Sequence, residues 1–114
     1  MSRSGSRETE RYETLKSEVA AVGLIRRGSL VRRLVACGKS NCCCQADPPR
    51  LHGPYYQWTR KVHGKTVTVR VTKAQAKLLA KWIANGRRLN KIVAQLERIS
   101  LRLTERQLRE LSKP

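Results

Sequence analysis

All four cysteines of the chain fall in one short segment, and this clustering limits the possible folds more than any other feature. Cys37, Cys42, Cys43 and Cys44 are followed by His52. Thiolate and imidazole are ligands that zinc prefers, and a structural zinc site needs four of them in a tetrahedron. We therefore predict a zinc knuckle in the Cys–His loop, residues 37–52, with Zn²⁺ bound by Cys37, Cys42, Cys44 and His52.

The spacing of these four residues, C-x4-C-x-C-x7-H, matches none of the common zinc-finger spacings, so the clustering carries the prediction. Cys43 is left out of the ligand set because it cannot easily share a tetrahedron with both of its direct neighbours. Two alternatives stay open: the thiols are simply reduced, or Cys42 and Cys44 form a redox pair. His63 lies at a predicted turn and is expected to be solvated.

The charge of the chain indicates its partners. The 114 residues contain 25 Lys and Arg against 8 Asp and Glu, a formal net charge of +17. The expected partner is a polyanion. Nucleic acid is the commonest one, and an anionic membrane surface is the competing candidate. No apolar run is long enough to span a bilayer, and the first residues lack the apolar core of a signal peptide. We expect a cytoplasmic protein without membrane attachment, in a compartment where disulfides are uncommon.

A β-hairpin is the clearest secondary-structure prediction. YYQWTRKV at residues 55–62 and KTVTVRV at residues 65–71 alternate in character and flank the turn His63–Gly64. Alternation places Val67, Val69 and Val71 on one face, with Tyr56, Trp58 and Val62 joining them. The other face is polar and cationic, and it carries Tyr55, Gln57, Thr59, Lys61, Thr66, Thr68 and Arg70.

Helices are predicted at both ends of the chain. After a polar tail at residues 1–6, the apolar residues Tyr12, Leu15, Val19 and Val22 predict a helix over residues 7–24. Ser29–Ala36 is expected to form a strand. Thr72 is a natural N-cap for a helix from Lys73 to about Leu103, and Thr104 with Gln107 predicts a separate helical turn after it.

The C-terminal helix carries a heptad seam formed by Leu89, Ile92, Leu96, Ile99 and Leu103. A helix of about 30 residues is roughly 45 Å long, which is longer than the small sheet beside it. Its distal half therefore needs a partner, either the N-terminal helix or a second copy of the chain. The fold class is α+β, with an N-terminal helix, residues 25–72 as a three-stranded antiparallel sheet around the knuckle, and a long helix within residues 73–114.

The function favoured by this pattern is DNA or RNA binding by a small basic zinc protein. Cations that neutralise phosphates release counterions, and a two-stranded ribbon can enter the major groove. Tyr55 is alternatively a platform for an unpaired base. The candidate nucleic-acid-binding residues are Arg26, Arg27, Arg32, Arg33, Tyr55, Gln57, Thr59, Arg60, Lys61, Lys65, Thr66, Thr68, Arg70, Arg87, Arg88 and Lys91.

Two other functions were weighed against this one. A coiled-coil adaptor or homodimer would use the heptad seam to bind its partner. An enzyme is not expected, because a metal-dependent nuclease needs several convergent carboxylates and the chain has a single aspartate, Asp47. A Cys43–His63 hydrolase would lack a third orienting group. We therefore name no catalytic residues.

The motifs also resemble a known family. GSLVRR, the CGKSNC-C-C cluster, HGPYY and the GKTVTVRV hairpin are similar to those of small bacterial proteins grouped as domain of unknown function 6788. The resemblance covers Gly28 to about Leu96. It implies that Cys37, Cys42, Cys44 and His52 are the metal-type positions and that Cys43 is variable. It also implies an accessory role for a mobile element or phage, because similar proteins are encoded near transposases and phage genes.

Overall fold

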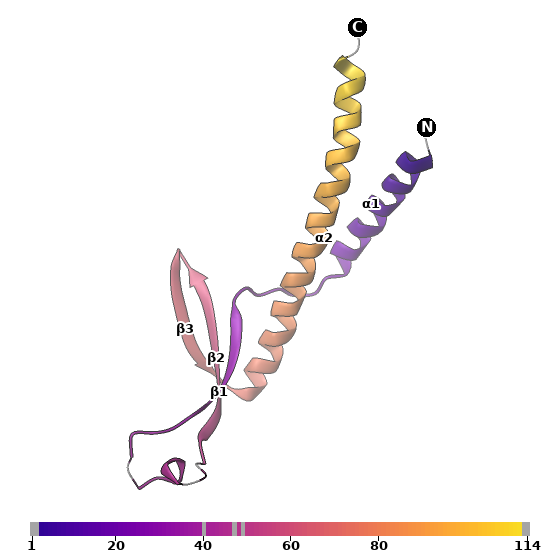
Figure 1. The fold of residues 1–114 in the computed structure, drawn as a ribbon. Coiled ribbons are helices and arrows are strands. Elements are labelled where there is room, and N and C mark those ends of the chain that lie inside the picture. The colour runs from indigo at the N-terminus through magenta and orange to yellow at the C-terminus, as the bar shows by residue number, and fades with distance from the viewer. Residues whose placement is uncertain (1–2, 40, 47, 49, 113–114) are drawn as a thin grey trace. The chain divides into compact units, whose positions relative to one another are not determined.

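The chain forms two helices and a three-stranded sheet, as expected for the α+β class. A computed structural model describes residues 3–39, 41–46, 48 and 50–112. Figure 1 shows the elements in chain order, which are α1 (Arg3–Ala21), β1 (Ser29–Val35), the short 3₁₀ helix η1 (Cys43–Gln45), β2 (His52–Val62), β3 (Lys65–Val71) and α2 (Lys73–Ser112). These elements belong to two compact units. The sheet unit comprises residues 25–84, and the helical unit comprises residues 1–24 with residues 85–114.

The three strands of the sheet unit are antiparallel in the order β1-β2-β3. The turn between β2 and β3 has φ of 49° at His63 and 82° at Gly64, which is the left-handed pair that a tight hairpin requires. His63 is exposed, as predicted. Trp58 pairs with Val69 and Thr59 pairs with Thr68, so the two predicted faces of the hairpin are confirmed.

The core of the sheet unit lies on the valine face. Trp58, Leu79 and Ile83 are buried there, with Leu30, Val71 and Trp82 packed against them. The first turns of α2 therefore cover this face of the sheet. Thr72 caps α2 as predicted: its hydroxyl accepts the N–H of Gln75 at 3.1 Å, and its own N–H donates to the Gln75 side chain at 2.9 Å. This is a complete capping box, closed by glutamine.

Only glycine fits at position 28, just before β1. Its φ is +119°, and an added Cβ would lie 2.3 Å from the Thr59 carbonyl oxygen and 2.7 Å from Nε1 of Trp58. This close approach lets the Trp58 indole donate to the Arg27 carbonyl at 3.1 Å. Gly28 therefore allows the segment before β1 to lie directly against the central strand.

The helical unit has its own core, in which α1 packs on α2. Leu15, Ile92 and Ile99 are buried together. The partly buried residues packed against them are Tyr12, Val19, Val22, Leu96 and Leu103. The heptad seam of α2 therefore has the N-terminal helix as its partner within the chain, which was one of the two expected arrangements. Leu89, also assigned to the seam, is half-buried.

Polar contacts complete the helical unit. Asn85 occupies the position at which the heptad seam, extended towards the N-terminus, would place a core residue. Its Nδ2 donates to the Leu24 carbonyl at 2.8 Å. This bond fixes the segment that follows α1. Glu8 receives hydrogen bonds from Arg102 at 3.0 Å and Arg106 at 3.1 Å. The two guanidinium groups, Arg102 first, lower the pKa of the Glu8 carboxyl below its ordinary value.

Several predicted boundaries were wrong. α1 begins at Arg3 instead of Arg7 and ends at Ala21, so the predicted tail overlaps the helix, while Met1 and Ser2 lie outside the described residues. β2 begins at His52, three residues before the predicted strand. α2 continues to Ser112 without the predicted interruption. The Thr104 hydroxyl does not cap a new helix, because it donates back to the Ser100 carbonyl at 2.7 Å within α2.

Neither α1 nor α2 is both long enough and apolar enough to cross a bilayer, within the residues that the structure describes.

Candidate metal centre and nucleic-acid interface

The Cys–His loop leaves the sheet at the end of β1 and returns at the start of β2 (Figure 1). Its return is fixed at Gly53, where φ is +121° and an added Cβ would lie 2.7 Å from the Arg33 carbonyl oxygen. The pairing of β1 with β2 shifts register between Arg33 and Val35, and Val35 pairs with His52. Only glycine permits the backbones of β1 and β2 to approach so closely here, and this approach places His52 beside the cysteines.

The four predicted ligands come together. One ligand atom from each of Cys37, Cys42, Cys44 and His52 lies within 4.8 Å of every other, and Cys44 is buried. The Sγ atoms of Cys37 and Cys44 are 3.4 Å apart, and Sγ of Cys42 lies 2.9 Å from Nε2 of His52. With metal–sulfur bonds of about 2.3 Å, a tetrahedral site has sulfur–sulfur edges of about 3.8 Å. The cluster therefore has the dimensions to hold a metal ion.

Neighbouring groups orient these ligands. The backbone N–H of Cys37 donates to Sγ of Cys44 at 3.3 Å. The Gln45 side chain donates to the same sulfur at 3.8 Å and to the Cys37 carbonyl at 3.2 Å. Within η1, Gln45 and Ala46 donate backbone N–H groups to the carbonyls of Cys42 and Cys43. Hydrogen bonds to ligand sulfur atoms fix their positions and stabilise thiolate charge.

The thiols of the loop differ in acidity. The pKa of Cys42 falls to about 6, because the backbone N–H of Cys44 donates to it, followed by the thiol of Cys37 and by His52. The backbone N–H of Lys39 is the largest influence on Cys37 and lowers its pKa, but the Cys44 thiol, burial and Cys42 together outweigh it and raise that pKa. The lowered pKa favours the thiolate form of Cys42, which is the form that binds metals.

Cys43 has a different role from the other cysteines. Its thiol is exposed and donates weakly to the Arg50 carbonyl at 3.7 Å, while its carbonyl accepts the Arg50 backbone N–H at 3.0 Å. A hydrogen bond with Cys42 raises the pKa of Cys43. Cys43 thus connects the two sides of the loop and does not belong to the cluster, in agreement with the sequence prediction.

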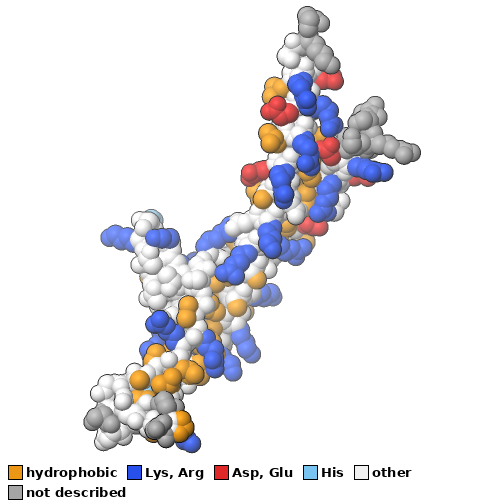
Figure 2. All heavy atoms as spheres, in the orientation of Figure 1, with side chains coloured by type: hydrophobic (Ala, Val, Ile, Leu, Met, Phe, Trp, Pro, Cys, Tyr) orange, Lys and Arg blue, Asp and Glu red, His pale blue; other side chains and the backbone are white. Residues whose placement is uncertain are grey.

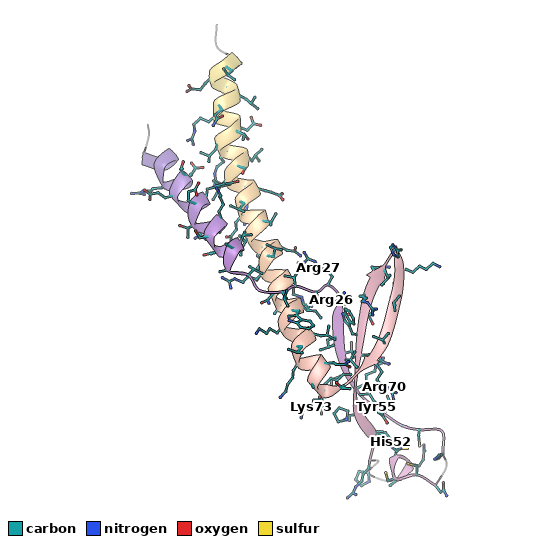
Figure 3. The ribbon with its side chains drawn as sticks, turned by 180° about the vertical axis from the view of Figure 1, so that it is seen from behind. Arg26, Arg27, His52, Tyr55, Arg70 and Lys73 are labelled. Carbon is teal, nitrogen blue, oxygen red and sulfur yellow. The ribbon has the colours of Figure 1, made fainter. Side chains whose placement is uncertain are left out.

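The face of the sheet opposite the core carries much of the predicted nucleic-acid interface. We call it the open face, and it is formed by Ser29, Val31, Arg33, Tyr55, Gln57, Thr59, Lys61, Thr66, Thr68 and Arg70. Arg33 pairs with Tyr55 across β1 and β2, and the Arg70 guanidinium lies 4.0 Å from the centre of the Tyr55 ring. Figure 3 shows Tyr55 and Arg70 side by side, near the point where β2 leaves the Cys–His loop.

Several polar side chains of the open face already bond to one another. The Thr59 and Thr68 hydroxyls are 2.9 Å apart, and the Lys61 ammonium donates to the Thr66 hydroxyl at 2.8 Å. A base edge would have to compete with these bonds. Arg33, Tyr55 and Arg70 are therefore the stronger binding candidates of this face.

Three predicted cations lie on the valine face: Arg32, Arg60 and Lys65, which pairs with Val62. Arg32 pairs with Tyr56 and is exposed, while Arg60 pairs with Val67 and lies 4.1 Å from the centre of the Trp58 ring. The sequence analysis assigned none of the three to the valine face. Residues two apart on a strand share a face, so the position of Arg60 beside Trp58 could have been inferred from the sequence.

Charge is unevenly divided between the two units. Residues 25–84 contain 13 Lys and Arg and one acidic residue, whereas residues 1–24 and 85–114 contain 12 and seven. The ion pairs between described side chains, Lys16–Glu13, Arg102–Glu8 and Arg106–Glu8, lie in the helical unit. On the face drawn in Figure 2, the acidic side chains likewise lie on the helical unit. The excess of cations is therefore concentrated in the sheet unit.

The predicted cations fall in both units of the chain. Arg87, Arg88 and Lys91 belong to the helical unit and Lys65 lies at the end of the hairpin. Sequence analysis also missed Lys39, Arg50 and Lys73, which are exposed cations of the sheet unit. A count of cations over residues 25–84 alone would have included them.

Together, the fold and the cluster define a small α+β protein whose loop between two strands carries a Cys–His cluster that could hold a metal ion. The chain belongs to the family described as a domain of unknown function (DUF6788), whose model matches residues 6–81. This confirms the resemblance, although the matched region begins well before Gly28 and ends before Leu96. The matched region contains all four cluster residues, but it ends within α2 and leaves out most of that helix. No curated protein and no solved structure matches the chain.

Proposed function

We propose that this chain binds nucleic acid through its sheet unit, with a structural zinc ion in the Cys–His loop. The observation that carries the proposal is the segregation of charge, with 13 cations against one acidic residue in residues 25–84. So few carboxylates can neutralise only a small part of this charge inside the unit. A polyanion is therefore the favoured partner.

Zinc is the proposed metal because three thiolates and one imidazole form a soft, tetrahedral donor set. Four protein ligands would leave no open position for water or substrate, which favours a structural role over a catalytic one. The ion would stabilise the end of the sheet where β1 and β2 meet the Cys–His loop, and so keep Tyr55 and Arg33 in place. We accordingly propose a non-catalytic protein.

The open face favours binding with little sequence preference. Its strongest contacts would come from Arg33 and Arg70, which suit phosphates, and from the Tyr55–Arg70 stack, on which an unpaired base can stack further. An accessory role for a mobile element or phage is the biological setting we propose, and it depends on the family resemblance alone. The adaptor alternative loses support because Ile92 and Ile99 are already buried against α1.

The test is binding of duplex DNA, single-stranded DNA and single-stranded RNA at several salt concentrations. Loss of two phosphate contacts reduces the slope of log K against log salt by about 1.8 for duplex DNA and about 1.4 for single strands. We expect such a change for the Arg33→Ala/Arg70→Ala variant. The matched control is Lys16→Ala/Arg109→Ala, which removes two cations from the helical unit.

Three results bear on the proposal. Binding by the wild type that weakens with salt, and weakens much more in the sheet variant than in the control, supports it. Equal effects of the two variants would mean that net charge alone acts and would refute the open face as the site. Absence of binding to all three nucleic acids at low salt would refute the function itself.

A further inference from the structure

A cavity of about 280 Å³ lies in the sheet unit beside the start of β1 and the end of β2. Its six lining residues are Ile25, Arg26, Arg27, Arg60, Lys61 and Val62. Four of the six are cationic and none is acidic. We propose that this cavity, which we call the phosphate pocket, binds a phosphate group through Arg26 and Arg60.

Arg60 supplies the first argument. Its Nη1 is buried and has no hydrogen-bond partner among the described residues. Its guanidinium lies 4.1 Å from the centre of the Trp58 ring. Contact with the ring face partly compensates the charge but leaves the N–H donors of Nη1 unused. A buried charged donor without an acceptor is costly. Because Arg60 lines the pocket, a reorientation of its guanidinium would bring this donor to a phosphate oxygen there.

Arg26 supplies the second argument. Its guanidinium lies 4.8 Å from the centre of the same Trp58 ring, so one indole positions two cations. The Arg26 backbone N–H donates to the Trp82 carbonyl at 3.1 Å, which fixes the main chain at this point. Figure 3 shows Arg26 and Arg27 on the segment that leads into β1. Trp58 is itself buried and bonded to the Arg27 carbonyl.

The chemistry of the pocket favours phosphate over other anions. Two guanidinium groups held on one ring present several N–H donors with little freedom left to lose. A phosphate group has several acceptor oxygens and can receive both groups at once, whereas a single carboxylate is satisfied by one guanidinium. No acidic side chain lines the pocket to compete for the cations.

The natural source of the phosphate depends on the proposed function. In a nucleic-acid complex it would be either a backbone phosphate or the phosphate at a strand end. The pocket itself is tested without nucleic acid, so failure of the one idea can be separated from failure of the other.

The first experiment uses inorganic phosphate and the fluorescence of Trp58. A Trp82→Phe variant leaves Trp58 as the only tryptophan and retains the backbone carbonyl that receives Arg26. We expect a saturable change in emission, and an Arg60→Gln substitution in the same background should weaken phosphate binding by about 10- to 100-fold. Arg109→Gln, the same substitution in the helical unit, should leave it unchanged. Phosphorus NMR line broadening with the unmodified chain gives the same information should Trp82→Phe fold poorly.

Absence of any response to phosphate, or equal responses from Arg60→Gln and Arg109→Gln, would overturn the pocket. The second experiment compares 5′-phosphorylated with 5′-hydroxyl oligonucleotides. Tighter binding of the phosphorylated strand that disappears in Arg60→Gln assigns the pocket to a strand end. Equal binding of both strands, with equal weakening in Arg60→Gln, assigns it to the backbone. Phosphate binding without binding of any oligonucleotide would retain the pocket and refute the proposed function.

Discussion

Truncating Leu15 tests the separate core of the helical unit. Its side chain is 0% exposed and packs with Ile92 and Ile99. Leucine-to-alanine changes at fully buried positions cost about 2–5 kcal/mol, depending on how far the cavity collapses. A unit of this size has a total stability of about 3–8 kcal/mol. The Leu15→Ala substitution should therefore remove a large part of the stability of the α1–α2 pair.

Two spectroscopic probes can follow the two units separately. Both tryptophans, Trp58 and Trp82, lie in the sheet unit, so their fluorescence reports on that unit, whereas most helical residues lie in the helical unit and dominate the far-ultraviolet circular dichroism. With a urea m-value of about 1 kcal/mol per molar for a small unit, the midpoint by circular dichroism should fall by about 2 M or more. The fluorescence midpoint should change much less.

The matched control is Leu111→Ala, the same substitution at a side chain of α2 that is 84% exposed. Its effect should stay within about 0.5 kcal/mol. A loss below about 1 kcal/mol for Leu15→Ala would contradict a core centred on this residue. If fluorescence and circular dichroism shifted together, the two hydrophobic clusters would not be energetically separate.

Three further predictions concern the metal, pH and the backbone. Protein purified without added metal should contain one zinc ion per chain, Cys37→Ser should lose it, and chelation should lower the melting temperature because metal-binding free energy is folding free energy. Arg102 and Arg106 lower the folded pKa of Glu8, so its stabilising contribution is complete above about pH 4.3, the unfolded value, and is lost as pH falls through the folded pKa. Glu8→Gln should therefore destabilise the chain at pH 7, and this cost should shrink as the pH falls through the folded pKa of Glu8. Gly28→Ala should lower the fluorescence midpoint, because the new Cβ would meet the Thr59 carbonyl oxygen at 2.3 Å.

Each of these has a matched control. Cys43→Ser should keep its zinc, since its thiol bonds to the Arg50 carbonyl outside the cluster, and equal metal loss in both cysteine variants would argue against the assigned ligands. Glu10→Gln removes an exposed carboxylate, and a pH profile identical to that of Glu8→Gln would discount the ion pairs. Gly38→Ala meets nothing within 4 Å of its Cβ. A Gly28 variant as stable as that one would contradict the close packing before β1.

The sequence predicted best where its signals were local. Alternation in the hairpin predicted the two faces of the sheet, and the clustering of cysteines predicted the Cys–His cluster that could hold a metal, because strand period and ligand chemistry depend on near neighbours. Helix ends were less predictable: Thr104 has the sequence of an N-cap, but its hydroxyl bonds backwards within α2. The sequence left the partner of the heptad seam undetermined, because a heptad pattern does not indicate which helix packs against it. The phosphate pocket was missed because Arg26 and Arg60 converge only through Trp58.

The helical unit joins the two ends of the chain, whereas the Cys–His loop draws its ligands from a few neighbouring positions. During synthesis these candidate ligands leave the ribosome together, so the proposed metal site could form before β3 and α2 exist. Leu15, by contrast, must wait for Ile92 and Ile99, which lie much further along the chain. Contacts so distant in sequence form slowly. Until Ile92 has been made, the apolar side of α1 has no partner in α2, and a ribosome that stalls before Ile92 would leave that side available to chaperones.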